Sequence, residues 1–326
     1  MDKIAITMGE PRGIGPEIIT KALFRSEIRD CCSPIVVGDA EVMKKAVKLT
    51  GLALKVAAIY SLSESHPGRG KIEVLHVKSP LFSKKGVTSE SAGRAVVKYI
   101  KKAVELALKK EVKAVVTAPI SKETLKAAGY SWQGHTELLA GLTGTKDFAM
   151  MFAGARLKVI LSTVHIPIKD VPAAISERLV LKTINLAQKG AGMFGIKNPR
   201  IAVAGLNPHA GESGLFGNEE IKAIIPAIEK ASGQGISVTG PYPADVVFHK
   251  AYKGDFDVVV CMYHDQGLGP FKMLEFKTGV NVTVGLPIIR TSPDHGTAFD
   301  IAWRNMADES SMSAAIKLAL TLKLCN

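Results

Sequence analysis

The sequence predicts an α/β protein whose sheets are largely parallel. Along its 326 residues, short apolar runs alternate with longer segments of helical periodicity, a pattern typical of parallel strands joined by helices. Glycine-rich polar clusters follow the ends of these runs, and in open parallel sheets that edge is where ligands bind. The composition, 47% hydrophobic and 22% charged, is ordinary for a globular protein, and the length suggests about two domains at roughly 100–200 residues each.

The expected strands are short apolar runs bounded by glycine, proline or polar residues. They are Lys3–Met8, Pro34–Gly38, Ala114–Thr117, Phe148–Phe152, Lys158–Ser162, Arg200–Ala204, Asp257–Cys261 and Asn281–Val284. Only a short Gly-containing link separates the runs at 148–152 and 158–162, so these two should form an antiparallel hairpin that interrupts the parallel order.

The expected helices lie between these strands, for example at Glu41–Leu49, Ala92–Lys109, Pro172–Lys189 and Ile221–Lys230. The sequence holds no internal repeat, no low-complexity tract and no evident linker. Ordinary loops must therefore cross any domain boundary, which favours two lobes that share a cleft over separate domains on a tether.

The charge and the apolar pattern argue against two classes of partner. Lys+Arg 42 minus Asp+Glu 30 gives +12, but the positive residues are scattered along helical stretches and only 6% of residues are aromatic. Nucleic acid is therefore not expected, and the excess reflects either solvated helix faces or steering of an anionic substrate. No window approaches the roughly 18 uninterrupted apolar residues of a membrane-spanning helix, so no membrane partner is expected.

The N-terminus and the cysteines favour a cytoplasmic location. The first strand reaches the polar cluster at residue 9 too soon to hold the apolar core of a signal peptide. Cys31 and Cys32 are adjacent, Cys261 lies in an apolar run and Cys325 is next to last. This spacing makes no disulfide framework and is typical of reduced, cytosolic cysteines.

The first glycine-rich cluster, residues 9–17, follows the first strand. Its Pro16 suits the first turn of a helix, where the missing N–H is not needed. The cluster matches neither the Gly-x-Gly-x-x-Gly dinucleotide fingerprint nor the Lys-Ser/Thr end of a P-loop. It predicts a tight turn that is either structural or part of a ligand site.

His135 and Thr136 stand at an apparent helix start. There they could offer an imidazole, a hydroxyl and backbone N–H groups to an anion. The alternative is that Thr136 is only the helix N-cap and the histidine is incidental.

Three further histidines each close a strand or the turn after it: His165, His209 and His264. They are 44 and 55 positions apart (209 minus 165, 264 minus 209), so no local ligand motif exists. Three neutral imidazoles with an open fourth position suit a catalytic Zn²⁺ or a similar divalent ion. A single histidine at a strand end is usually only hydrogen-bonded, and the repetition at equivalent sheet positions is what favours a metal.

The densest polar stretch, residues 263–272, adds the carboxylate of Asp265 and the amine of Lys272 to His264. Asp245 is another carboxylate, beside a Gly/Pro turn. Acidic and basic groups in one loop and helix start are candidates for proton transfer.

Asn281 and Arg290 bracket the last expected strand. The planar guanidinium of Arg290 suits a phosphate or carboxylate. A structural salt bridge with Asp294 or Asp300 is the alternative.

In sequence and order, these motifs resemble the 4-hydroxythreonine-4-phosphate dehydrogenase family of vitamin B6 biosynthesis. The matching segments span nearly the whole chain and lie at 6–11, 134–137, 205–212, 263–267 and 290–298. The resemblance implies a fold like that of isocitrate and isopropylmalate dehydrogenases, with two α/β/α lobes, a cleft between them and an obligate homodimer. The lobes would be residues 1–140 with 291–326, and residues 141–290, the second carrying most metal and substrate residues.

The resemblance also implies the site residues. The metal ligands would be His165, His209 and His264, which hold one Zn²⁺, Mg²⁺ or Co²⁺ ion in a site assembled across the dimer interface. The substrate contacts would be His135, Thr136, Lys272, Asn281 and Arg290, and the catalytic residues Asp245, Asp265 and Lys272. The residues alone do not rank Asp265 against Lys272 as the proton carrier, and they leave the NAD or NADP contacts unassigned. Arg12 departs from the family, where many members have a small residue, and residues 269–271 are variable.

The implied reaction is NAD-dependent oxidation of 4-phosphohydroxy-L-threonine to 2-amino-3-oxo-4-phosphooxybutanoate. This β-keto acid then decarboxylates to 3-amino-2-oxopropyl phosphate, in pyridoxal phosphate biosynthesis. The alternative within the superfamily is a D-threonate or D-erythronate 4-phosphate dehydrogenase of sugar-acid catabolism. A metal-dependent hydrolase or a phospho-ligand binding module on the same lobes is a different class, and it would form no NADH.

Overall fold

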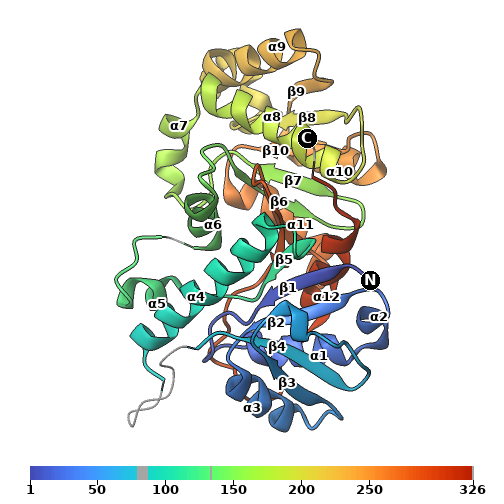
Figure 1. Cartoon of the computed structure of the whole chain (residues 1–326). Coiled ribbons are helices and arrows are strands. Elements are labelled where there is room, and N and C mark those ends of the chain that lie inside the picture. The colour runs from blue at the N-terminus through green and yellow to red at the C-terminus, as the bar shows by residue number, and fades with distance from the viewer. Residues whose placement is uncertain (79–86, 133, 325–326) are drawn as a thin grey trace. The chain divides into compact units, whose positions relative to one another are not determined.

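The computed structural model describes residues 1–78, 87–132 and 134–324, and it divides into two compact units (Figure 1). Unit 1 comprises Met1–Thr145 and Leu286–Thr321, and unit 2 comprises Lys146–Gly285 with the residues from Leu322 onward. Cys325 lies outside the described residues, and the other three cysteines are free thiols. Within the described ranges, no helix is long and apolar enough to cross a membrane.

The sheet of unit 1 is parallel throughout its paired strands. In spatial order its strands are β3 (Lys55–Ile59), β4 (Lys71–His76), β2 (Ser33–Gly38), β1 (Lys3–Thr7), β5 (Ala114–Thr117) and β12 (Ile289–Pro293). The central strand β1 is almost wholly buried, as expected for a parallel strand covered on both faces.

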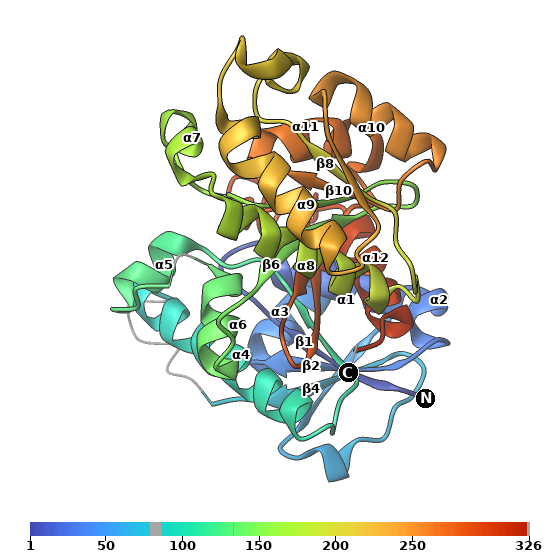
Figure 2. The same cartoon turned by 90° about the horizontal axis from the view of Figure 1, so that it is seen from above.

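The helices of unit 1 cover both faces of this sheet. They are α1 (Gly15–Phe24), α2 (Ser26–Arg29), α3 (Ala40–Thr50), α4 (Ser89–Leu108), α5 (Lys122–Ala127), α6 (His135–Thr143) and α12 (Ser310–Thr321), with a 3₁₀ turn at Leu62–Glu64. Helices α4, α5 and α6 pack together on one face (Figure 2), whereas α12 contacts α1 and lies against β12. Pro16 occupies the first turn of α1, as the sequence predicts.

The sheet of unit 2 is mixed. Its spatial order is β11 (Val280–Val284), β6 (Ala149–Ala153), β7 (Lys158–Leu161), β10 (Val258–Cys261), β8 (Ile201–Ala204) and β9 (Val238–Tyr242). Strand β6 is antiparallel to both β7 and β11, and the remaining pairs are parallel. The predicted hairpin is therefore confirmed, as is the mostly parallel α/β class.

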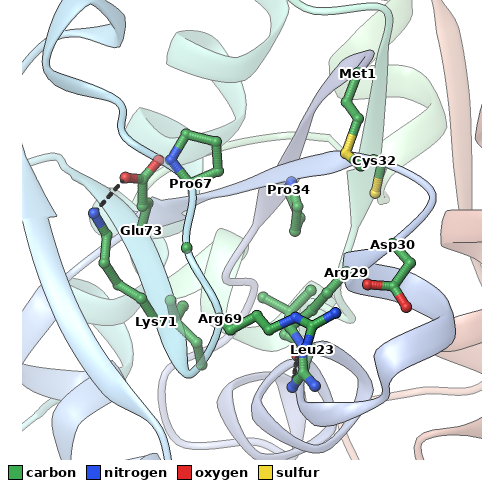
Figure 3. Close-up of a pocket in the computed structure, with 12 residues that line it drawn as sticks. Met1, Leu23, Arg29, Asp30, Cys32, Pro34, Pro67, Arg69, Lys71 and Glu73 are labelled. Atoms are coloured by element: carbon green, nitrogen blue, oxygen red, sulfur yellow. Dashed lines mark hydrogen bonds and ion pairs between the residues drawn. The ribbon is translucent and has the colours of Figure 1, made fainter.

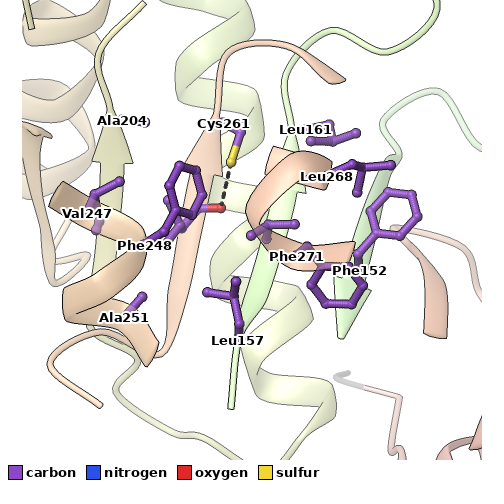
Figure 4. Close-up of a cluster of buried hydrophobic side chains, with 13 residues drawn as sticks. Phe152, Leu157, Leu161, Ala204, Val247, Phe248, Ala251, Cys261, Leu268 and Phe271 are labelled. Atoms are coloured by element: carbon purple, nitrogen blue, oxygen red, sulfur yellow. Dashed lines mark hydrogen bonds between the residues drawn. The ribbon is translucent and has the colours of Figure 1, made fainter. Parts of the chain in front are cut away.

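The helices of unit 2 enclose an apolar core. They are α7 (Val171–Ala174), α8 (Glu177–Met193), α9 (Ile225–Gly233), α10 (Ala244–Lys253) and α11 (His264–Glu275), with 3₁₀ turns at Ile168–Asp170 and Pro208–Gly214 and a π-helical turn at Glu220–Ile224. Figure 4 shows Phe248 of α10 and Phe271 of α11 over β8, β10 and β7. The rings of Phe271 and Phe152 lie 5.9 Å apart, so α11 is anchored directly to the sheet.

Several elements differ from the sequence-based expectation. The helix expected at 172–189 is broken, because Ile175 and Ser176 are extended and Ser176 caps the start of α8. The helix expected at 221–230 begins with the π-helical turn. Strands β3, β4, β9 and β12 are absent from the sequence-based expectation. Strands β4 and β12 contain charged residues, β9 contains Gly240 and Pro241, and β3 is a short, largely exposed strand at the edge of the sheet.

Candidate active site

Four adjacent strands of unit 2 present candidate residues at their carboxyl ends. In the order β7, β10, β8 and β9, these strands lead to His165, His264, His209 and Asp245. Because the strands are parallel, their carboxyl ends meet at one edge of the sheet, where loops and helix starts form ligand sites.

Backbone pairing continues beyond β7 and β10 and brings two of the histidines together. Thr163 donates its N–H to the carbonyl of Met262 at 3.1 Å, and its hydroxyl donates to the same oxygen at 2.7 Å. His165 and His264 each follow this pair by two residues, and their ring centroids lie 5.7 Å apart. The pairing of Thr163 with Met262 therefore places these two imidazoles next to each other.

The third histidine, His209, lies in an unusual backbone segment after β8. Residues 209–213 all have positive φ values, between 43° and 80°, and only Gly211 is a glycine. Left-handed helical backbone costs about 1–2 kcal/mol for each L-residue, so the surroundings must hold this turn in place. Strain of this kind is concentrated at functional sites.

Carboxylates orient two of the three imidazoles. Nδ1 of His264 lies 2.7 Å from Oδ1 of Asp265, and Nδ1 of His209 lies 3.0 Å from Oε2 of Glu212. A carboxylate at Nδ1 fixes the tautomer and leaves Nε2 as the ligating atom, the usual arrangement at metal sites. Within the described part of a single chain, no three such side chains come close enough to hold a metal.

Gln266 connects the loops after β10 and β8, and sequence reasoning did not single it out. Its Oε1 accepts from the N–H of Met262 at 2.7 Å, and its Nε2 donates to the carbonyl of Gly205 at 2.6 Å. Only 7% of Gln266 is exposed. Because the buried side chain of Gln266 is hydrogen-bonded to both loops, it fixes the relative positions of the two backbone segments that lead to His264 and His209.

The other candidates of unit 2 lie at different depths. Asp245 is exposed in the first turn of α10, and Asp265 is exposed beside His264. Lys272 is half-buried two turns further along α11, about 12 Å from His264 at 1.5 Å per residue. In β11, Oδ1 of Asn281 is buried without a hydrogen-bond partner, which suits an atom that meets a ligand.

Unit 1 holds a buried cation with a hydroxyl at its side. Arg290 in β12 is 2% exposed, and its Nε and Nη2 donate to Oγ1 of Thr117 at 3.2 and 2.7 Å. Arg290 pairs with Val115 in register, so Arg290 and Thr117 share one face of the sheet, opposite to that of Thr291, which bonds α12. Burial lowers the pKa of Arg290 to about 9, and Glu137 acts against this shift.

His135 and Thr136 begin α6 in the same unit, where Thr136 is buried and His135 is partly exposed. The N-cap is Gly134, so the alternative in which Thr136 caps the helix is wrong. Burial lowers the pKa of His135 well below its usual range, and the charge of Arg290 lowers it further. His135 is therefore neutral at pH 7, and its Nε2 is buried without a hydrogen-bond partner.

The glycine-rich turn after β1 is built around a buried acid. Glu10 is fully buried, and its Oε1 lies 2.8 Å from Nε of Arg12. Arg12 also donates to the hydroxyls of Ser89 and Thr124, each at 3.0 Å, so it ties the turn to α4 and α5. Gly9 has φ 72°, and a side chain there would meet the carbonyl of Pro119 at 2.5 Å. Arg12 is thus part of a local structural network.

A separate cavity of about 410 Å³ lies at the other edge of the unit 1 sheet (Figure 3). It is lined by residues at the starts of β2 and β4, including Pro34 and the Lys71–Glu73 ion pair. None of its lining residues is a candidate site residue. The strand polarity places the candidate residues of unit 1 away from this cavity.

The comparisons with known proteins agree on one family. A family model described as Pyridoxal phosphate biosynthetic protein PdxA matches residues 30–319. A 4-hydroxythreonine-4-phosphate dehydrogenase of Desulforapulum autotrophicum is 48% identical over 321 residues, which cover 97% of this chain and 94% of that protein. A D-threonate 4-phosphate dehydrogenase of Cupriavidus necator is 47% identical over 316 residues, 96% of this chain and 95% of that protein. A crystal structure of 4-hydroxythreonine-4-phosphate dehydrogenase from Klebsiella pneumoniae has a TM-score of 0.90 and 42% identity, covering 98% of each chain.

Proposed function

The chain belongs to the family of pyridoxal phosphate biosynthetic protein PdxA, and from this premise we propose that it oxidises 4-phosphohydroxy-L-threonine with NAD or NADP. The product, 2-amino-3-oxo-4-phosphooxybutanoate, then loses CO₂ to give 3-amino-2-oxopropyl phosphate. The observation that carries this proposal is the 48% identity to a relative of that name over 97% of the chain.

The buried cation of unit 1 supports an anionic substrate. A guanidinium that is 2% exposed is stabilised when an anion binds beside it, because burial in protein strengthens the attraction. Neutral His135 and the N–H groups at the start of α6 would bind the same class of oxygen atoms. We assign Arg290, His135 and Thr136 to substrate binding, together with Asn281 and Lys272 of unit 2.

The histidines of unit 2 fit a divalent metal ion. His165 and His264 lie ring to ring, and local carboxylates hold Nδ1 of both His264 and His209. These are the features of imidazole ligands with an oriented Nε2, so His165, His209 and His264 would hold Zn²⁺, Mg²⁺ or Co²⁺. When bound, such an ion supplies Lewis-acid chemistry, which favours alcohol deprotonation and polarises a ketone.

The remaining acidic and basic side chains would move protons. Asp265 is exposed and contacts His264, so it can exchange protons with solvent and with a substrate beside that ring. Lys272 and Asp245 are the other proton-transfer candidates, and all three remain assignments to be tested by mutation. Hydride transfer itself belongs to the nicotinamide cofactor.

We further propose that the active site is completed in a homodimer. Two of the histidines are brought together within the chain, whereas no cluster of three is found among the described residues. A second copy related by a two-fold axis would supply the missing ligand twice, giving two identical sites.

Mixing two inactive variants tests the dimer. If the ligands come from different chains, subunit exchange between His165→Ala and His209→Ala gives hybrid dimers with one intact site, and activity returns to at most half that of wild type in the hybrid fraction. All three pairings are needed. Absence of rescue in every pairing, with exchange confirmed, would contradict the shared site.

A second candidate substrate is D-threonate or D-erythronate 4-phosphate. It is favoured by the Cupriavidus necator relative, whose 47% identity is close to that of the first relative. The two candidates differ at carbon 2, where one carries an amino group and the other a hydroxyl.

The reaction is tested by the absorbance of NADH in a mixture of protein, divalent metal, NAD and 4-phosphohydroxy-L-threonine. The proposal predicts NADH and CO₂ in equal amounts, and loss of both after chelation of the metal. Phosphate release without NADH would instead indicate a hydrolase, and substrate binding without turnover would indicate a binding module.

A further inference from the structure

The left-handed turn that carries His209 rests on one buried carboxylate, that of Glu220. Glu220 begins the π-helical turn before α9 and is 2% exposed. Its Oε1 accepts from the backbone N–H groups of Leu206 and Asn207, both at 2.8 Å. Its Oε2 accepts from Nδ2 of Asn207 at 2.9 Å. The side chain of Glu220 therefore accepts three hydrogen bonds, which fix the positions of Leu206 and Asn207 just before the turn.

The turn also packs closely against this carboxylate. A side chain at Gly211 would come within 2.7 Å of Oε2 of Glu220, and one at Gly205 would come within 2.7 Å of Cα of Ala210. Gly211 has φ 80°, a conformation that only glycine adopts readily. The segment therefore folds over the Glu220 carboxylate with no room for another side chain between them.

The local helix geometry is consistent with this arrangement. A π-helical turn is rare, and such turns occur frequently at functional sites. Here the π-helical turn begins at Glu220, which accepts three hydrogen bonds from Leu206 and Asn207, whereas the neighbouring Glu219 is partly exposed and accepts one, from Nδ2 of Asn207 at 2.7 Å. Glu220 is thus the buried contact of this segment, and Glu219 is a more exposed contact to the same asparagine.

We propose that Glu220 is the positioning residue of His209: its buried carboxylate holds Leu206 and Asn207 and packs against Gly211, and so fixes the strained left-handed turn at 209–213 that presents the imidazole for metal binding. This inference rests on the proposed function, in which His209 is a metal ligand. Glu220 touches neither substrate nor metal in this account. It acts by removing the freedom of the backbone that carries the ligand.

Glu220→Gln is the informative variant, and Glu219→Gln is its matched control. The glutamine oxygen can still accept from the two backbone N–H groups, but its NH₂ would face the NH₂ of Asn207, so one bond becomes a repulsion. We expect the dissociation constant for Co²⁺ to rise by about 10–100-fold, the range seen when partners of metal ligands are removed. Glu219→Gln should change it by less than about twofold.

Two further measurements separate positioning from general folding. Amide hydrogen exchange at Leu206 and Asn207 should accelerate in Glu220→Gln, while exchange in the core of β10 stays as in wild type. If Glu220→Gln does not fold, Gly211→Ala offers a second route, since its methyl group would push the turn and the Glu220 carboxylate apart while the glutamate itself is kept. It should weaken Co²⁺ binding without changing exchange in β10.

Each outcome decides the proposal. Unchanged Co²⁺ affinity in Glu220→Gln would overturn it, with or without faster exchange, and so would equal losses in Glu219→Gln and Glu220→Gln. If the wild-type protein binds no Co²⁺, or binds it equally well after His209→Ala, the metal assignment of the proposed function fails. The exchange rates at Leu206 and Asn207 would then still show whether Glu220 holds the turn.

Discussion

The candidate residues of the two units differ most in their burial. In unit 1, Arg290 and Thr136 are each 2% exposed, whereas in unit 2 the side chains of His209 and His264 are 66% and 37% exposed. The unit 1 groups are fixed by strand and helix packing before any ligand arrives. The unit 2 imidazoles are oriented by local carboxylates but remain open to solvent. This difference is consistent with the proposed function, in which the anion site of unit 1 is preformed and the metal site of unit 2 is completed only when an ion and further ligands bind.

The largest loss of activity is expected from changes to the three exposed or partly exposed histidines of unit 2. Changing His165, His209 or His264 to Ala should lower turnover by more than about a hundredfold, beyond the range for outer partners of a metal site, and should abolish bound metal. Because exposed side chains contribute little to folding, the unfolding temperature should stay near that of wild type. Turnover and metal content are measured on the same samples.

His249→Ala is the control for this prediction, since His249 is an exposed histidine on α10 away from the strand ends. It should retain full activity and metal. A triple alanine variant that still oxidised substrate after chelation would refute the metal assignment.

Arg290→Lys should give the next largest effect. Lysine keeps the positive charge but loses the planar fork, so the Michaelis constant for substrate should rise by about 10–100-fold, as expected for lost hydrogen bonds to a charged group. The Michaelis constant for NAD should change little. Equal losses for NAD and substrate would assign Arg290 to the fold or to the cofactor instead.

Thr117→Val should have a smaller effect of the same kind. It removes the hydroxyl that accepts from Nε and Nη2 of Arg290, so the Michaelis constant for substrate should rise about tenfold. Thr117→Ser, which keeps the acceptor, should restore most of the affinity.

Thr7→Val is the matched control, because Thr7 is fully buried, pairs with Thr117 in register and has no hydrogen-bond partner at its hydroxyl. It should leave the Michaelis constant near the wild-type value. An equal loss in Thr7→Val would show that sheet packing, rather than the contact with Arg290, is responsible.

The smallest effect is a dependence of stability on pH in unit 1. The pKa of His135 is depressed by burial, so below about pH 6.5 the unfolded chain binds a proton there that the folded chain does not. Folding stability should therefore fall as the pH falls below that value, by at most about 1.4 kcal/mol per pH unit from this group. Urea unfolding between pH 5 and 7 measures it.

His135→Asn should remove this contribution and flatten the acid side of the profile. An unchanged slope would show that His135 titrates normally in the folded protein.

The sequence predicted well the features that depend on local pattern. An apolar run followed by a histidine was enough to locate His165, His209 and His264 after strands, because the carboxyl ends of parallel strands are where chains turn outward. The short link between the two apolar runs at 148–162 was likewise enough to predict the antiparallel hairpin. The family resemblance supplied the proposed residue roles that spacing alone left open.

The remaining features depend on tertiary contacts that no local pattern records. The left-handed turn at 209–213 contains one glycine, so the preference that usually signals positive φ was nearly absent. In the sequence, Thr117 is only the last residue of a strand and Glu220 is only one of two adjacent glutamates. Their roles become visible only through the buried groups that they contact in the fold. Strand β12 was missed because Arg290 and its polar neighbours are buried by packing, against their own hydropathy.

The most direct test of the account is the ratio of catalytic efficiencies for 4-phosphohydroxy-L-threonine and D-threonate 4-phosphate. Both are measured by NADH formation with the same metal-loaded enzyme. We predict a kcat/KM that favours 4-phosphohydroxy-L-threonine by at least about tenfold, because a buried polar group left unpaired by the wrong substituent weakens the transition state. A ratio reversed in favour of D-threonate 4-phosphate would contradict the biosynthetic assignment and identify the enzyme as catabolic.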